Sequence, residues 1–321
     1  MRKNALIICC FACAFGAFGA FFRWLQNQLA FDAVTGMLNS SMWNILVPLT
    51  LVATATVFFF LIRKVLGGLA APEEMYDTFR GTTFFHPIAA WIIGGITAIG
   101  GVVTIFSSSL DPQSGALTVI GLLAIVTGIS FPSICTAAKK HFSPNLISVF
   151  SALPILMFAL WLVTCYIRNA SIPNVWKYGI EIVAISVIIL AFYYNAGFAF
   201  GKPKPKMALY TSMLGSFMGL VSLADSRAIG MQIILFGASA MLLMYCWMIV
   251  SNMREPDESE AAEEPKPEES EKEAEAEPTE ENETVIPAGE KVVTAEPTLQ
   301  APTHRDSDVD AIISEVKSTD K

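Results

Sequence analysis

Eight stretches of this chain are apolar for roughly 18 residues or more, and they limit its fold more than any other feature. A helix needs about 20 mostly apolar residues to cross the hydrocarbon of a bilayer. Lipid also offers the backbone no hydrogen-bond partner outside a helix or a closed barrel. We therefore predict an all-α fold, a polytopic transmembrane helical bundle of about eight spans. The predicted spans are approximately 5–22, 45–62, 87–107, 116–137, 146–167, 177–200, 207–224 and 228–251.

Charge divides the chain near Arg254. Residues 1–254 contain 15 Lys/Arg and 7 Asp/Glu, whereas residues 255–321 contain 6 and 22, so balances of +8 and −16 give the net charge of −8. The acidic part is poor in aromatic residues and cannot bury enough apolar surface to fold alone. We predict a transmembrane domain over 1–254 and an acidic disordered linker over 255–307. No segment remains for a large soluble catalytic domain.

Basic residues are spread unevenly over the connections between the predicted spans. With the N-terminus inside, inner segments carry eleven Lys/Arg and outer ones carry four. Cytoplasmic connections are the ones enriched in Lys and Arg, so we predict that both termini are cytoplasmic and that the protein lies in the cell membrane. Its first partner is the lipid bilayer. The four outer residues are Arg23, Arg168, Lys177 and Arg227.

The first apolar run allows two interpretations. Its basic start and the Ala-Phe-Gly-Ala at 17–20 resemble a secretory signal with a small-residue cleavage site. Phe21 extends the apolar run past that site, which favours a retained span. A face of small residues, suited to close packing on another helix, is formed by Ala12, Gly16 and Ala20.

Small residues also follow helical spacing in the third and fourth predicted spans. Residues at i, i+3 or i+4 and i+7 share one face, and small side chains there let two helix backbones approach closely. This pattern predicts a tightly packed bundle. The residues are Gly94, Ala98 and Gly101 in the third span and Gly121, Ala124 and Gly128 in the fourth.

Ionisable residues inside membrane spans mark ion paths, proton relays and catalysis, and here Glu181 is the one carboxylate within a predicted span. Lys177 lies four residues earlier, so a local ion pair is the simplest interpretation. Arg168 is a second possible partner, and a substrate or proton role for Glu181 is the alternative. Either way, Glu181 belongs to the candidate polar site of the bundle.

Enzyme signatures are absent from the sequence. There is no Gly-x-Ser-x-Gly turn, no His-Glu-x-x-His helix and no phosphate-binding Gly-x-x-x-x-Gly-Lys loop. The three histidines are far apart, and all six cysteines fall in apolar runs, where they act as small apolar residues. We expect no catalytic residue, no metal, no cofactor and no nucleic-acid partner.

The sixth predicted span contains a second group of polar residues, Tyr193, Tyr194 and Asn195, ahead of three lysines spaced by prolines. Tyrosine rings anchor helices at membrane interfaces, and Asn195 is expected to make an interhelical hydrogen bond. The alternative is a polar vestibule. These three residues and Glu181 form the candidate polar site.

Short strings outside the spans carry a resemblance. They are Arg23-Trp24, Ala30-Phe31-Asp32, Thr35-Gly36-Met37 and Phe79-Arg80-Gly81, with Met37 in place of the usual leucine. The chain resembles a group of uncharacterised multi-pass membrane proteins from Gram-positive bacteria over about 35 residues. That resemblance implies a bacterial cell membrane and brings no known activity.

The end of the tail has a different pattern from the acidic linker. Residues 308–317 are predicted to form a short amphipathic helix, followed by a disordered end at 318–321. An apolar stripe on a charged tether is typical of a docking peptide that folds into the groove of a cytoplasmic protein partner. A disordered end with accidental apolar residues is the alternative. The stripe consists of Val309, Ile312, Ile313 and Val316.

Together these observations favour a multi-pass integral membrane protein without catalytic machinery. We interpret the chain as a membrane interaction or assembly protein that presents a tethered cytoplasmic docking helix. The alternative is a small-molecule permease, or a permease subunit, with its pathway near Tyr193–Asn195. Permeases can work with aromatic rings, amides and unwound backbone alone, so the scarcity of charge does not exclude them.

Overall fold

The computed structural model describes residues 2–31, 42–66, 68–69, 72, 74–80, 85–108, 115–140, 143–170 and 174–254. The chain divides into two compact units, 1–264 and 265–321, and every described residue belongs to the first. The predicted linker 255–307, docking helix 308–317 and end 318–321 lie outside the described residues. The described part is helical throughout: α1 (Arg2–Leu29), α2 (Trp43–Leu66), α3 (Met75–Thr78), α4 (Phe85–Ser108), α5 (Gly115–Lys140), α6 (Pro144–Asn169), η1 (Val175–Lys177), α7 (Gly179–Ala199), α8 (Pro205–Ser222) and α9 (Ile229–Asn252).

Each of the eight predicted spans is a helix in the structure. Seven of these helices are long and apolar enough to cross a membrane: α1, α2, α4, α5, α6, α7 and α9. The predicted span 207–224 corresponds to α8, which is shorter and carries several Ser, Thr and Gly residues. Most α8 residues are buried against other helices rather than left on the surface. A helix so enclosed has little contact with lipid and needs less apolar composition.

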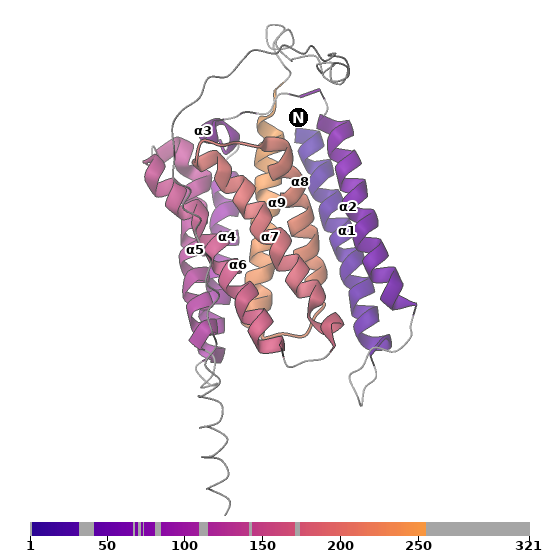
Figure 1. The fold of residues 1–321 in the computed structure, drawn as a ribbon. Coiled ribbons are helices and arrows are strands. Elements are labelled where there is room, and N and C mark those ends of the chain that lie inside the picture. The colour runs from indigo at the N-terminus through magenta and orange to yellow at the C-terminus, as the bar shows by residue number, and fades with distance from the viewer. Residues whose placement is uncertain are drawn as a thin grey trace, which may run out of the picture. The chain divides into compact units, whose positions relative to one another are not determined.

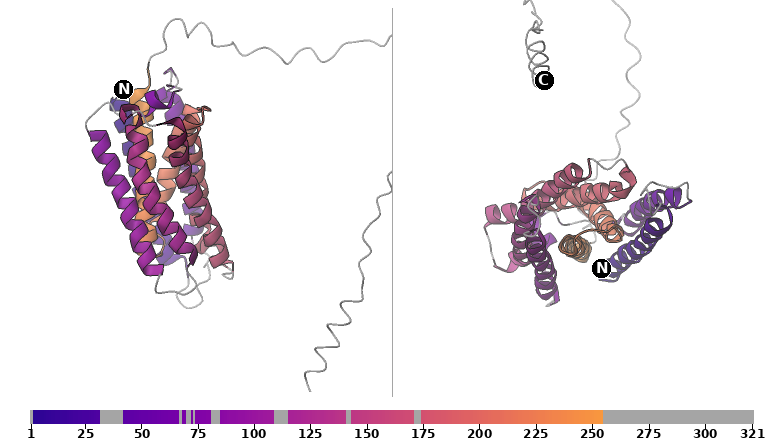
Figure 2. Two further views of the ribbon diagram at one scale, coloured as in Figure 1. Left: turned by 90° about the vertical axis from the view of Figure 1, so that its left-hand side faces the viewer. Right: turned by 90° about the horizontal axis from the view of Figure 1, so that it is seen from below.

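The central pair of the bundle is α8 and α9. α8 contacts α1, α2, α7 and α9, while α9 contacts α1, α4, α7 and α8. α1 and α2 lie on one side of this pair and α4 and α5 on the other, with α6 and α7 covering a third side (Figure 1, Figure 2). We call the end of the bundle where α1 ends and α9 begins the Asp225 end. The opposite end, where α9 ends, is the Arg254 end.

The predicted faces of small residues are helix–helix contacts. α4 and α5 meet at Gly94 and Gly128, where an added Cβ on either residue would strike the carbonyl oxygen of the other. Gly101 and Gly121 face each other in the same way, about two helical turns nearer the Asp225 end. The close packing predicted for these two spans is therefore confirmed, and each is the other's partner.

α1 uses its small face against α8. A side chain at Gly16 would strike Leu220, and Ala12 is fully buried. α1 is one continuous helix through the Ala-Phe-Gly-Ala of residues 17–20. The helix continues for seven residues beyond position 22, where the predicted span ends.

The middle of the bundle is filled with apolar side chains. Phe58 of α2, Phe192 of α7 and Phe217 of α8 are all nearly inaccessible, and Phe58 and Phe217 meet edge to face at 5.8 Å. Ser239 of α9, a buried hydroxyl at mid-depth, donates to the carbonyl of Leu235 in its own helix at 2.9 Å. The described helices hold no charged side chain at mid-depth.

Candidate functional site

Arg23 is the most deeply buried charged side chain among the described residues, with no exposed surface. Its Nε donates to Oδ1 of Asp225 at 2.6 Å, and its Nη1 donates to Oε1 of Gln26 at 2.6 Å. Its Nη2 donates to the carbonyl oxygens of Trp176 at 3.1 Å and Lys177 at 3.4 Å. A buried charge is tolerated when it is paired and its remaining donors are bonded. Because all three nitrogens have acceptors, the charge of Arg23 is tolerated inside the bundle at this end of α1.

Asp225 joins three parts of the chain at this end. Its Oδ1 also accepts from Nδ2 of Asn27 at 3.2 Å, and its Oδ2 accepts from Nη2 of Arg227 at 3.3 Å. The backbone oxygen of Asp225 accepts from Nε2 of Gln232 at 3.2 Å. Asp225, Ser226 and Arg227 form the turn between α8 and α9. The structure shows that this turn between α8 and α9 holds the end of α1 in place.

Glu181 has different partners from those predicted. Its Oε2 pairs with Nη2 of Arg227 at 3.5 Å, and its Oε1 accepts from Nε1 of Trp161 at 2.9 Å. The expected ion pair with Lys177 is wrong, because Lys177 ends the 3₁₀ turn η1 and precedes the first residue of α7. The i, i+4 geometry of an α-helix therefore does not connect residues 177 and 181.

A polar pocket of about 470 Å³ opens beside Glu181 and Arg227. The side chain of Arg227 is 8 % exposed, and Glu181 is 16 % exposed. Two nitrogens of Arg227, Nε and Nη1, are buried and have no hydrogen-bond partner among the described residues. The pocket lies at the Asp225 end, between the ends of α4 and α6 and the starts of α5, α7 and α9. Its lining comprises Ser107, Ser108, Leu117, Trp161, Thr164, Cys165, Arg168, Asn169, Glu181, Ser226, Arg227, Ala228 and Met231.

The Tyr193–Asn195 group does not join Glu181 in one site. Asn195 lies 14 residues further along α7, about 21 Å away by helical rise. Asn195 is buried, and its Nδ2 donates to Oγ of Ser212 on α8 at 2.6 Å and to the carbonyl of Ala191 at 2.8 Å. The predicted interhelical hydrogen bond is confirmed. Tyr193 is 60 % exposed on the bundle surface, and Tyr194 is half-buried.

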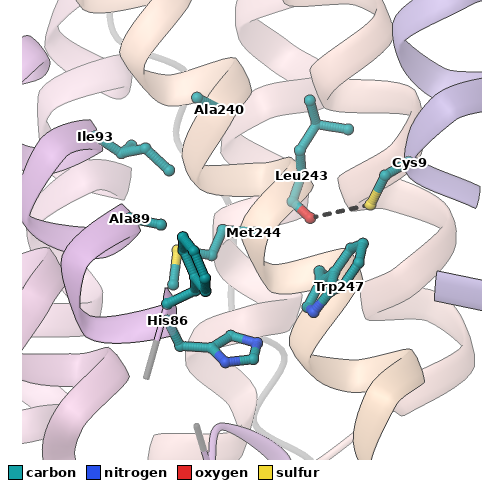
Figure 3. Close-up of a pocket in the computed structure, with 9 residues that line it drawn as sticks. Cys9, His86, Ala89, Ile93, Ala240, Leu243, Met244 and Trp247 are labelled. Carbon is teal, nitrogen blue, oxygen red and sulfur yellow. Dashed lines mark hydrogen bonds between the residues drawn. The ribbon is translucent and has the colours of Figure 1, made fainter. Parts of the chain in front are cut away.

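An apolar groove of about 550 Å³ lies between α1 and α4, with α9 as its floor (Figure 3). Cys9 of α1 stands on one wall, and its thiol is placed to donate to the carbonyl of Leu243 at 3.6 Å. His86, Ala89 and Ile93 of α4 stand on the other wall. The floor is formed by Ala240, Leu243, Met244 and Trp247 of α9, and Phe85 completes the lining. The groove belongs to the half of the bundle nearer Arg254.

The remaining predictions concern the docking residues, the cysteines and metal binding. The docking residues Val309, Ile312, Ile313 and Val316 lie outside the described residues. All six cysteines are free thiols. Among the described residues no group of three or more His, Cys, Asp or Glu side chains could hold a metal ion.

Sequence reasoning missed Arg23, Asp225 and Arg227 as members of one network. Arg23 was counted as an outer loop residue, and the three lie up to 204 positions apart. One signal was present: Arg23, Asp225 and Arg227 each directly adjoin a predicted span end, where a side chain turned inward must find a partner.

Comparison with protein-family models, curated proteins and solved structures finds no match. The class of protein therefore rests on the chain itself. Seven helices with the length and composition of membrane spans give it the character of a multi-pass membrane protein.

Proposed function

We propose that all eight long helices cross the cell membrane, with α8 as the eighth span and both termini in the cytoplasm. Eleven basic residues lie on segments at the Arg254 end and four at the Asp225 end. Two of those four, Arg23 and Arg227, are buried in ion pairs. The Asp225 end therefore shows solvent only Arg168 and Lys177 among the described basic residues. This imbalance supports an Arg254 end that faces the cytoplasm.

The protein's role, in this proposal, is membrane interaction or assembly rather than catalysis or transport. The mid-depth interior supports it, because apolar side chains leave no charged group there for proton transfer or ion coordination. The short-motif resemblance to multi-pass proteins of Gram-positive bacteria agrees with the proposed location and adds no activity.

The apolar groove over α9 is the single observation that carries the interaction role. α9 is the most enclosed of the spans, yet Ala240, Leu243 and Trp247 remain partly exposed in the groove between α1 and α4. The small residues Ala89 and Ala240 allow another backbone to come close, which is how transmembrane helices associate. We assign the groove to a transmembrane helix of a partner protein.

The tail supports this choice of occupant over an acyl chain. α9 leads from the groove residue Trp247 into the acidic tail after Arg254, so the groove and the tail serve the same side of the membrane. In this proposal, the apolar stripe at 309–316 binds the cytoplasmic part of the same partner. The two contacts reinforce each other because the first raises the effective concentration for the second.

Site-specific photo-crosslinking tests the proposal. A photoreactive residue replaces Ala240 in the groove, and a matched control replaces Val52, which is exposed on α2. We expect one discrete protein adduct from position 240 that weakens when Ile312→Asp and Ile313→Asp are introduced into the tail. Lipid adducts alone at position 240, or the same protein adduct from position 52, contradict the proposal.

A permease is the second candidate, and the polar pocket at the Asp225 end is the observation in its favour. A pathway needs that pocket to continue through the apolar middle of the bundle. Cysteines placed at Ala238, buried in the middle of α9, and at Ser226, on the pocket rim, separate the two roles in a cysteine-free background. We expect a water-soluble maleimide to label position 226 and not position 238. Labelling of position 238 favours the permease.

A further inference from the structure

We propose that the polar pocket at the Asp225 end binds a small ligand through an oxyanion group, a carboxylate or a phosphate. Arg227 is the recognition residue and Arg168 an additional charge at the rim. This site is independent of the proposed assembly role, because it lies at the other end of the bundle from the groove and the tail.

The position of the Arg227 guanidinium is fixed by its neighbours. Its Nη2 donates to Oγ of Ser222 at 2.8 Å and lies 3.3 Å from Asp225 and 3.5 Å from Glu181. All three contacts fall on this one nitrogen, so the side chain is held without using its other donors. A ligand thus meets an arginine that is already oriented, which lowers the entropy lost on binding.

The remaining donors of Arg227 require an acceptor. Nε and Nη1 are buried, line the pocket through their residue, and have no partner among the described residues. A buried charged donor left without an acceptor is strongly unfavourable. The acceptors that best match a guanidinium are the oxygens of carboxylates and phosphates.

The charge balance of the site favours an anion. Arg23 and Arg227 balance Asp225 and Glu181 within the buried network. Arg168 lines the same pocket, is exposed, and is in none of the described ion pairs. The described lining therefore holds one positive charge in excess, which a singly charged ligand would neutralise.

The rest of the lining limits the size of the ligand and provides an aromatic and apolar surface for it to pack on. Trp161 stacks on Phe158 at 5.5 Å and is anchored by its bond to Glu181, so its ring is held still at the pocket. Leu117 and Met231 add apolar surface, and Asn169 and Thr164 add polar groups. A volume of about 470 Å³ suits a small organic molecule and is within the usual range of ligand pockets.

Thermal melts of the full-length protein in neutral detergent test this proposal. Sodium acetate and inorganic phosphate are titrated against sodium chloride at constant ionic strength, because a ligand that binds the folded state raises the melting temperature. We expect Arg227→Lys to weaken the anion's affinity about tenfold or more. Arg168→Gln, an exposed residue whose loss leaves the network intact, should weaken it about two- to fivefold.

The control is Lys177→Gln, which removes a positive charge at the same end from a residue that does not line the pocket. It should respond to acetate and phosphate as the wild type does. Equal responses from the wild type and Arg168→Gln overturn the proposal even where Arg227→Lys fails to fold, as does a Lys177→Gln response that falls as far as that of Arg168→Gln.

Two lipid environments identify the source of the oxyanion. Nanodiscs of phosphatidylcholine are compared with nanodiscs containing phosphatidylglycerol. A melting temperature that rises with phosphatidylglycerol, and falls back in Arg168→Gln, assigns the pocket to a lipid headgroup. A response to soluble acetate or phosphate alone assigns it to a water-soluble ligand.

Discussion

The two ends of the bundle use charge in opposite ways. At the Asp225 end, Arg23, Asp225, Arg227 and Glu181 are paired with one another inside the helices. At the Arg254 end, the described charges are exposed: Arg63 and Lys64 on α2, Arg80, and the lysines around the turn before α8. Buried pairs fix one geometry because each charge needs its partner, whereas exposed charges leave geometry free. The charges of the Asp225 end are therefore fixed in position, whereas those of the Arg254 end form a charged surface.

Removing Arg23 is the strongest test of whether the buried charges at the Asp225 end stabilise the bundle. Arg23→Ala leaves Asp225 short of its closest partner in a buried setting, and we expect a loss of about 3–5 kcal/mol in the free energy of unfolding. Thermal melts in nanodiscs and yield after detergent extraction measure it. Lys204→Ala at the other end is the matched control and should melt as the wild type does. A wild-type melt for Arg23→Ala shows that the network does not hold the bundle together.

Glu181→Gln gives an intermediate effect. Glutamine keeps the size of the side chain but removes the charge facing Arg227, so we expect a loss of about 1–3 kcal/mol. The comparison variant is Lys177→Gln, which the structure leaves outside the ion pairs. If Lys177→Gln destabilises the protein as much as Glu181→Gln, the sequence-based pairing of residues 177 and 181 is correct and the structural one is not.

Asn195 is buried and polar but uncharged, so it shows how much a buried hydrogen bond contributes without an ion pair. Asn195→Ala removes its bond to Ser212, and interhelical hydrogen bonds in membranes contribute about 0.6 kcal/mol on average. We expect a loss of about 1 kcal/mol or less. Ser212→Ala and the double variant complete a mutant cycle. The double variant should lose less stability than the sum of the two single losses, because both single variants break the same hydrogen bond. If the losses add, the two side chains do not interact.

The smallest effect on stability is expected at the Arg254 end. Replacing Lys202, Lys204 and Lys206 with glutamine should leave the melting temperature unchanged, because these side chains are exposed. The same variant should retain less anionic lipid in native mass spectrometry, since basic residues beside a span attract anionic headgroups. An unchanged lipid count contradicts the role assigned to this end.

Most of the helical layout could be predicted from the sequence, because long apolar runs determine where helices lie in a membrane protein. The α4–α5 contact also followed from local spacing, since Gly94 and Gly128 each belong to a periodic small-residue face. Asn195 was read correctly because a polar group within a span has few ways to find a partner. In each case the deciding information lay within one or two turns of a helix.

The network at the Asp225 end could not be predicted for the opposite reason. Arg23 and its counter-ion Asp225 are 202 residues apart, and neither has a neighbour in sequence that reveals the other. From the sequence alone, Arg23 therefore looked like the start of a loop rather than part of α1. Glu181 was given a local partner because Lys177 was near in sequence, whereas its true partner comes from the turn after α8.

The distance between Arg23 and Asp225 along the chain also constrains biosynthesis. The first span leaves the ribosome long before the hairpin of α8 and α9 exists, so the Arg23 guanidinium must wait for most of the domain to be translated before it meets its carboxylate. Until then α1 lacks both its ion pair and the α8 surface that covers Gly16. The buried contacts of α1 are therefore among the last to form, once the hairpin of α8 and α9 has been made.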